Sequence, residues 1–196
     1  MPVLLVALAY VLGTFPSAVL VARANGVDIR SVGSGNPGAS NVTRVLGWRK
    51  GAWVYLLDAL KGALAAGVAL AIDGRPLAYW AGAAVIIGHM FPVFFRFQGG
   101  KGVATGSGVL FVLQPLIAPF AVLMWWLVTR FTGKAAIGSV VVVALVPAGL
   151  ALVDRDAWEY PATAALCALI VLKHWRNIGR LVRREEHSLS RGEQTV

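Results

Sequence analysis

Cysteine, histidine and acidic residues are all scarce in this chain of 196 residues. The single cysteine, Cys167, excludes a disulfide within the chain and lies in an apolar run, where we expect a packed thiol. Three scattered histidines and no cysteine pair give none of the spacings of a zinc site, so we expect no metal and no cofactor. Only 9 Asp and Glu residues accompany 18 Lys and Arg residues, and the formal net charge is +9. In a soluble protein this imbalance would suggest a nucleic-acid partner.

Charged residues of either sign make up only 14% of the chain, whereas 58% of the residues are hydrophobic. Soluble domains of this size are far less apolar. Long apolar runs alternate with short polar breaks, which predicts an all-α integral membrane protein. We expect a single polytopic membrane domain over residues 1–196, with a polar cytoplasmic tail from about 175 to 196. Its partners would include membrane lipids and no nucleic acid, and its first apolar run, which lacks a basic leader, would be a retained helix.

The apolar runs approach the roughly 20 residues that a helix needs to cross a bilayer core of about 30 Å. One run, 103–131, is ambiguous because Gln114, Pro115 and Pro119 interrupt it. It is compatible with one kinked helix or with a hairpin of two short helices. Residues 23–50 read as a loop rich in Gly, Ser, Asn and Arg. The clear spans are predicted at about 2–22, 51–72, 77–95, 135–153 and 157–174.

The distribution of basic residues favours the hairpin. A hairpin gives seven transmembrane helices and gathers most of the basic residues on one side, leaving Arg75 and Arg155 on the other. The positive-inside rule then predicts an outside N-terminus and a cytoplasmic C-terminus. A re-entrant hairpin has the same parity and stays open as an alternative. In either form, the N-terminal ends of segments two, four and six point to the cytoplasmic face, where anions should collect.

The predicted loop 23–50 contains Ser-Gly-Asn-Pro-Gly-Ala-Ser-Asn at positions 34–41, followed by Arg44. Serine hydroxyls, asparagine amides and glycine backbone N–H groups can donate to a phosphate, and the arginine can bind it with two parallel hydrogen bonds. The simpler interpretation is a turn that caps the next helix.

An apolar segment passes into Gly-Gly-Lys-Gly within residues 88–105, as expected at a membrane interface. Gly99, Gly100 and Gly102 permit backbone conformations closed to other residues, and Lys101 adds a compact cation, which together suit a phosphate. The motif is not a Walker A sequence, and a mobile loop whose lysine faces anionic lipid is the alternative. His89, below the interface, is either part of this site or an interhelical hydrogen-bonding residue.

Two further groups of polar residues lie at or inside the predicted spans. His174 and Asn177 are three residues apart and share one helix face at the end of the last span. They could also be ordinary interfacial residues. Asp58 and Lys61 are charges deep inside a span, where each alone would cost roughly 2.5–3.5 kcal/mol, and their spacing lets them pair. A structural pair is favoured over a pair that borders a site.

Three stretches together resemble a known family. Residues 34–41, 88–105 and 174–186 are similar, in order and spacing, to the three signature regions of the bacterial acyl-phosphate glycerol-3-phosphate acyltransferases, the PlsY family. The stretch Gly-His-x-Phe-Pro-x-Phe-x-x-Phe-x-Gly-Gly-Lys-Gly-Val-Ala-Thr is long and specific. The sequence differs from the usual family pattern at Ser40, Ala136 and Arg184.

The resemblance implies transfer of a fatty acyl group from acyl phosphate to the 1-hydroxyl of glycerol 3-phosphate, the first acylation of phospholipid synthesis. It implies that loop 34–41 cradles the acyl phosphate, and that Arg44, Ser139 and the Gly99–Gly102 turn help to hold glycerol 3-phosphate. It assigns catalysis to Lys101, His174 and Asn177. The full set of implied substrate-binding residues is Ser34, Gly35, Asn36, Gly38, Ser40, Asn41, Arg44, His89, Gly99, Gly100, Lys101, Gly102, Thr105, Ser139, His174 and Asn177.

An acyl phosphate has a good leaving group, so the reaction needs positioning and oxyanion stabilisation but no covalent nucleophile. The hydroxyl proton could pass to His174 or to the leaving phosphate, and the phosphate is preferred. By resemblance the enzyme acts at the cytoplasmic face of the bacterial inner membrane and can work as a monomer. An anion transporter and an anionic-lipid scaffold are the competing hypotheses. The polar residues cluster at one face and not at the midplane, which disfavours a transporter.

Overall fold

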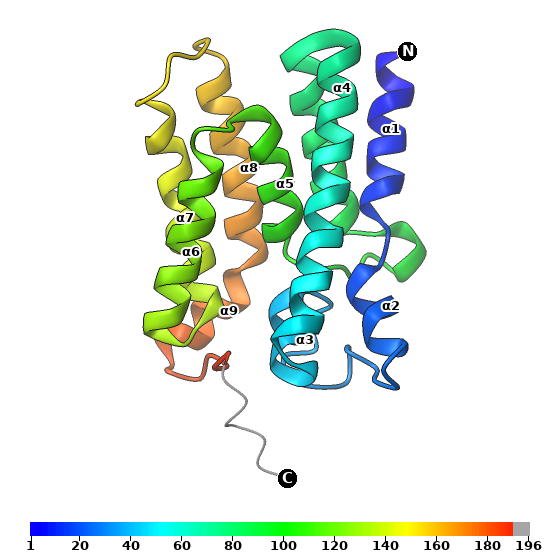
Figure 1. The fold of residues 1–196 in the computed structure, drawn as a ribbon, viewed down its shortest axis with the longest axis vertical. Helices are drawn as coiled ribbons and strands as arrows, with labels where there is room; N and C mark the ends of the chain where they lie inside the picture. Colours follow the sequence, from blue (N-terminus) through cyan, green and yellow to red (C-terminus); the bar gives the residue numbers. More distant parts are fainter. Residues whose placement is uncertain (190–196) are drawn as a thin grey trace.

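Every regular element in residues 1–189, the part of the chain that this computed structural model describes, is helical. The long helices run along one axis, and the short helices α2, α3 and α9 lie at one end of it (Figure 1). This end is called the motif end, because α3 and α9 carry the first and third polar motifs. The opposite, far end carries the N-terminus and the connector 151–158. The elements are α1 Pro2–Gly13, α2 Ser17–Arg23, α3 Ala39–Leu46, α4 Trp48–Met90, the 3₁₀ turn η1 Val93–Phe95, α5 Val103–Leu113, α6 Ala118–Thr132, α7 Ala135–Leu150, α8 Glu159–Lys173 and α9 Trp175–Val182.

The predicted first span is broken. α1 ends at Gly13 and α2 begins at Ser17, because Pro16 has no N–H with which to continue the helical hydrogen bonds. The segment Pro2–Arg23 is nevertheless long and apolar enough to cross a membrane, and so is Trp48–Phe95. The break separates α1, which runs along the long axis, from α2, which lies at the motif end (Figure 1).

The second and third predicted spans are the two arms of α4, which turns back at the far end (Figure 1). Helical geometry is lost at Asp73 and Gly74, and the φ of 71° at Gly74 is one that side chains with a Cβ rarely adopt. Pro76 follows at the start of the second arm, where a missing N–H is tolerated. The predicted break between the two spans is therefore confirmed, but it is shorter than the four residues predicted, because only Asp73 and Gly74 are non-helical.

Residues 103–131 form a hairpin, so the single kinked helix is excluded. α5 stops at Leu113, and α6 begins at Ala118 with Pro119 in its first turn. The two helices have 11 and 15 residues. Like α7 and α8, with 16 and 15 residues, each is shorter than the roughly 20 residues of a typical transmembrane helix.

Two segments predicted as loop and tail contain helices. α3 lies within the predicted loop 23–50, and its Val42 is fully buried against Ala18 and Ile29. α9 lies within the predicted tail, and it buries Asn177. Both are only eight residues long, too short for a periodic pattern to separate them from turns. Residues 190–196 of the predicted tail lie outside the described residues.

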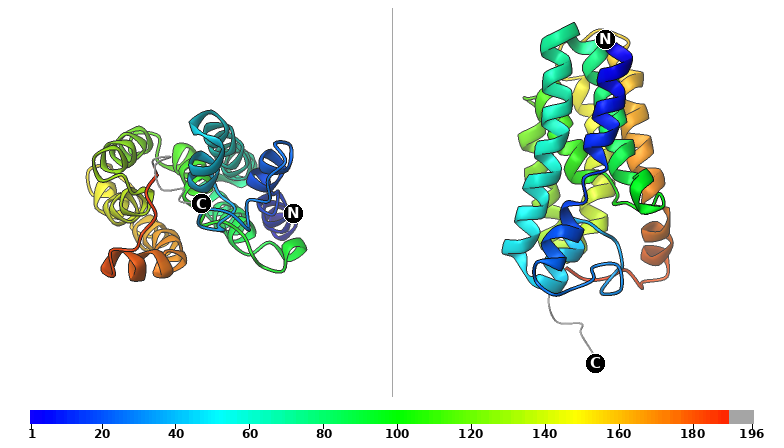
Figure 2. Two further views of the ribbon diagram at one scale, coloured as in Figure 1. Left: turned by 90° about the horizontal axis from the view of Figure 1, so that it is seen from below. Right: turned by 90° about the vertical axis from the view of Figure 1, so that its right-hand side faces the viewer.

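The helices form two groups, which the view along the axis separates (Figure 2). In the first group, α1 packs on the second arm of α4 so closely that a Cβ on Gly88 would overlap Tyr10 O. α5 approaches the first arm in the same way, since a Cβ on Gly108 would overlap Ala59 O. The second group contains α6, α7, α8 and α9. The space between the two groups holds the cavity described next.

Candidate active site

A cavity of about 530 Å³ opens between the two groups of helices. This volume lies within the usual range of small-molecule sites. Residues from all three sequence motifs meet at its motif end, although they are far apart in the chain. The predicted site residues that line it are Ser34, Asn36, Gly38, Ser40, Asn41, Arg44, His89, Lys101, Gly102, Ser139, His174 and Asn177.

The loop before α3 is held in shape by Asn41. Its Oδ1 accepts from Ser34 N at 2.9 Å and from Arg44 Nη1 at 3.1 Å, and its Nδ2 donates to Ile29 O and Val32 O at 3.1 and 3.0 Å. These four bonds use the whole hydrogen-bonding capacity of the amide. Asn41 therefore shapes the loop and orients Arg44, and it has no group left to bind a ligand in this conformation.

The Gly99–Gly102 turn is fixed from below by the end of α4. Gly99 N donates to Met90 O at 3.2 Å, and Gly100 N donates to His89 O at 3.1 Å. A Cβ on Gly100 would overlap His89 Nε2, so the turn lies directly on the imidazole. The glycine at position 100 is required by this close approach, and His89 supports the turn that presents Lys101.

Asp58, Lys61 and His89 form one buried cluster beneath that turn. Lys61 Nζ donates to Asp58 Oδ1 at 2.8 Å, to His89 Nδ1 at 2.9 Å and to Phe15 O at 3.0 Å. Ser17 Oγ donates to the same carboxylate oxygen at 2.9 Å. The predicted pairing of Asp58 with Lys61 is confirmed. Because an ammonium only donates, His89 Nδ1 accepts, and the ring carries its proton on Nε2, next to Gly100.

The environment of Lys101 disfavours the charged form of its side chain. Burial is the main cause that lowers the pKa of its ammonium to about 8; Glu186 opposes this shift, and the nearby guanidinium groups of Arg180 and Arg44 contribute to it. A dianion entering the cavity would relieve this repulsion. The electrostatics of the motif end therefore favour a phosphate.

His174 follows the last residue of α8 and is almost fully buried. Its Nδ1 lies 2.8 Å from Ile170 O, and because a carbonyl only accepts, Nδ1 carries the proton and Nε2 has a free lone pair. Burial lowers the pKa of His174 to about 4, with a smaller contribution from Lys101. The imidazole is thus neutral at pH 7, and it can accept a hydrogen bond on the cavity side but is a weak base.

Glu186 is a cavity residue absent from the predicted site set. It accepts from Asn177 Nδ2 at 2.7 Å and from Arg180 Nε at 2.9 Å, and its backbone oxygen accepts from Lys134 Nζ at 3.0 Å. The segment that carries it also bonds to Arg44, through Ser188 O at 2.6 Å. The chain after α9 thus returns across the motif end and links both groups of helices. In the sequence, only the position of Glu186 at the end of the third motif, residues 174–186, indicated that it belongs to the site.

Four predicted binding residues, Gly35, Gly99, Gly100 and Thr105, do not line the cavity. Gly99 and Gly100 border a smaller pocket on the other side of the turn. The Thr105 side chain is fully buried, and its Oγ1 has no partner within residues 1–189. Gly35 has a φ of 67° and serves the turn itself. In this conformation these four residues lie behind the cavity wall or in its turns, and their contact with substrate stays a prediction.

Away from the motif end the cavity wall becomes apolar. Leu110 from α5, Val143 and Val146 from α7, and Leu166 and Ile170 from α8 face it. Only a few polar groups interrupt this wall before the far end is reached. The cavity therefore joins a cationic mouth to an apolar trough.

The chain resembles known proteins over nearly its whole length. Residues 3–184 match the family model described as glycerol-3-phosphate acyltransferase. A glycerol-3-phosphate acyltransferase of Aquifex aeolicus (strain VF5) is 41% identical over 191 residues, covering 93% of this chain and 96% of the relative. The corresponding protein of Myxococcus xanthus (strain DK1622) is 45% identical over 186 residues, covering 93% of this chain and 96% of the relative.

Solved structures share the fold. PlsY, an integral membrane glycerol 3-phosphate acyltransferase, superposes in its glycerol 3-phosphate form with a TM-score of 0.90 and 38% identity, covering 95% of this chain and 94% of PlsY. Its lysophosphatidic acid form gives a TM-score of 0.89 and 36% identity, covering 97% and 96%. The resemblance expected from the three motifs is confirmed. The chain belongs to the glycerol-3-phosphate acyltransferase family and has the fold of the integral membrane enzyme PlsY.

Proposed function

We propose that the cavity transfers a fatty acyl group from acyl phosphate to the 1-hydroxyl of glycerol 3-phosphate. The products are 1-acyl-glycerol 3-phosphate and phosphate. The observation that carries this proposal is the union, in one cavity, of a cationic polar mouth and an apolar trough. One substrate is doubly anionic and the other has a long apolar chain, so each part of the cavity matches one of them.

The two phosphates are assigned to different walls of the mouth. The loop that contains Ser34 and Asn36 offers donors to the acyl phosphate. Arg44 and Lys101 face glycerol 3-phosphate, with Asn177 beside them. The acyl chain would follow the apolar wall of α8 toward the far end. This arrangement brings the 1-hydroxyl against the acyl carbonyl and converts a bimolecular encounter into a positioned reaction.

In the reaction, the hydroxyl oxygen forms a bond to the acyl carbonyl carbon, and the bond from that carbon to the phosphate oxygen breaks. The phosphate leaves with the electron pair and takes up the hydroxyl proton. His174 orients the hydroxyl through Nε2, and its low pKa makes it a poor acceptor for a full proton. Lys101 and backbone N–H groups stabilise the charge that develops on the oxygens.

We also propose the membrane placement. The chain would be a single polytopic domain over residues 1–196 of the bacterial inner membrane, with seven spanning segments, an outside N-terminus and the motif end in the cytoplasm. The basic residues of the motif end support this orientation. We further propose that the enzyme can work as a monomer.

One assay tests the reaction. Purified protein in detergent receives labelled glycerol 3-phosphate with palmitoyl phosphate, palmitoyl-CoA or palmitoyl acyl carrier protein as donor. We expect product from palmitoyl phosphate alone. Activity only with the thioesters would overturn the donor, and activity with none would return the anion transporter and the lipid scaffold to consideration.

A further inference from the structure

The cavity has a defined floor at the far end. Tyr79 from α4, Leu113 and Gln114 from the end of α5, and Thr163 from α8 line it there. Each of these side chains is at least nine-tenths buried. Three of them, Tyr79, Gln114 and Thr163, are polar groups at the end of an otherwise apolar trough. The proposed acyl transfer does not use them.

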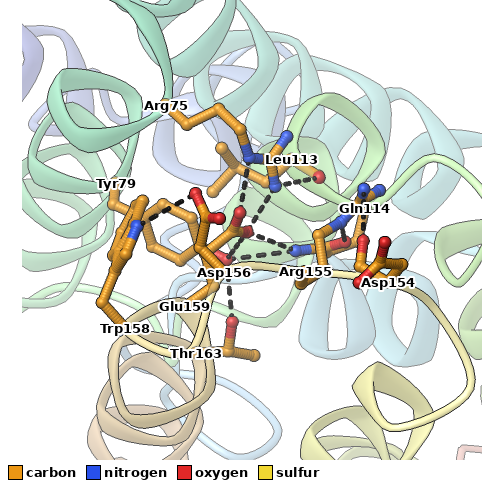
Figure 3. A network of polar contacts seen from close by, with 10 residues as sticks. All are labelled: Arg75, Tyr79, Leu113, Gln114, Asp154, Arg155, Asp156, Trp158, Glu159 and Thr163. Atoms are coloured by element: carbon orange, nitrogen blue, oxygen red, sulfur yellow. Dashed lines mark hydrogen bonds and ion pairs between the residues drawn. The ribbon is translucent and has the colours of Figure 1, made fainter.

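A closed network of hydrogen bonds makes this floor rigid (Figure 3). The Tyr79 hydroxyl donates to Glu159 Oε2 at 3.0 Å and accepts from Gln114 Nε2 at 3.1 Å, and it lies 2.9 Å from Thr163 Oγ1. Arg75 binds both oxygens of the Glu159 carboxylate. With these bonds the Tyr79 hydroxyl has one acceptor and two possible donors, which is its full set of partners. A rotation of the Tyr79 side chain to lengthen the trough would break these hydrogen bonds.

The depth of the trough can be worked out from two helices. On α8, His174 lies at the mouth and Thr163 at the floor, 11 residues apart, and at 1.5 Å per residue this gives about 16 Å. On α5, Gly102 and Leu113 give the same depth. An extended alkyl chain advances about 1.25 Å per carbon, because its bonds of about 1.5 Å alternate in direction. The trough therefore accommodates about 13 carbons.

Resting on the function proposed above, we propose that the Tyr79–Gln114–Thr163 floor sets the length of acyl chain that this enzyme prefers. Methylenes up to the floor are buried in the trough. Longer chains must bend or leave between the two groups of helices, and their extra methylenes add no binding. Depth in the trough can be read from positions on α8, because Ile170, Cys167 and Thr163 line the cavity at 4, 7 and 11 residues from His174.

Cys167 provides the test. It lies seven residues from His174, about 10 Å along α8, which corresponds to about 8 carbons. Cys167→Trp would place a bulky ring across the trough at that depth. Ala168→Trp is the matched control, because Ala168 is the next residue on the same helix but is exposed on the outer surface. The kcat/KM of wild type and both variants is measured with acyl phosphates of 4 to 18 carbons in one detergent.

In wild type we expect kcat/KM to rise with chain length, by up to about fourfold per methylene, and to stop rising near 13 carbons. Cys167→Trp should move this break to about 8 carbons and leave short chains active, whereas Ala168→Trp should keep the wild-type break. An unchanged break in Cys167→Trp, or an equal loss at every chain length, would overturn the proposal. No product from wild type with any acyl phosphate would instead overturn the proposed function.

A second measurement requires no substitution. Cys167 is the sole cysteine, so the rate of its reaction with N-ethylmaleimide reports on that depth of the trough. Lysophosphatidic acid with a 12-carbon chain should slow labelling at least tenfold relative to the 4-carbon compound. Equal labelling rates with the two compounds would contradict the placement of the chain along α8.

Discussion

The buried pair of Asp58 and Lys61 allows a quantitative prediction. Both side chains are almost inaccessible, and Lys61 uses all three ammonium protons, on Asp58, His89 and Phe15 O. Lys61→Ala would leave the Asp58 carboxylate buried with only the Ser17 hydroxyl and the imidazole beside it. Removing one partner of a buried pair typically costs about 3–5 kcal/mol. Asp58→Ala should have a cost of the same size, because it leaves the ammonium unpaired.

The double variant separates pairing from packing. With both charges removed, the remaining losses are the hydrogen bonds to Phe15 O, His89 Nδ1 and Ser17 Oγ and two small cavities, but no buried charge is left unpaired. We therefore expect the double variant to be about 1–3 kcal/mol more stable than either single variant. For a chain of this size, about 2–4 °C in Tm corresponds to each kcal/mol. Thermal unfolding in detergent measures all three variants, with Lys50→Ala on the exposed start of α4 as control. A double variant no more stable than either single would refute the pairing.

Three further predictions concern the motif end. Gly100→Ala should reduce acyl transfer more than tenfold, because the added Cβ would overlap the His89 ring. The control Gly67→Ala, at a helical glycine with room for a Cβ, should have near wild-type activity. Equal activities of the two variants would contradict the role of the turn. The KM for glycerol 3-phosphate should rise as pH passes about 8, because Lys101 is cationic below its pKa and neutral above it, and Lys101→Arg should abolish that rise. His174→Gln should keep measurable kcat at saturating substrate; a complete loss of turnover with intact binding would identify His174 as a general base.

Much of the bundle follows from the sequence, because apolar runs of about 20 residues have few stable arrangements in a membrane. The turn at Asp73 and the hairpin after Gly102 are marked by glycine, proline and polar residues. The break at Pro16 was missed because the run 2–22 is apolar on both sides of it, and a proline alone does not say whether a helix kinks or ends. α3 and α9 were missed because their packing against other helices, not their own pattern, stabilises them.

The composition of the site was more predictable than the role of each member. The motifs identified which residues gather, and the structure brings most of them to one cavity. They could not separate Lys101, which faces the cavity, from Thr105, which packs behind it, since both lie in one continuous motif. The position of Glu186 against Asn177 depends on the path of the chain after α9, which no local sequence rule fixes. The floor around Tyr79 was likewise not predicted, because the partners of Tyr79 come from two other elements, the end of α5 and α8.

The most direct test of the proposed site is a structure of the wild-type protein with glycerol 3-phosphate and a non-hydrolysable palmitoyl phosphonate. We expect one phosphate within about 3 Å of Arg44 and Lys101 and the phosphonate on the loop that contains Ser34 and Asn36. We also expect the acyl chain to follow α8 toward Thr163. Phosphate groups bound outside the cavity, or an acyl chain on the outer surface of the bundle, would contradict it.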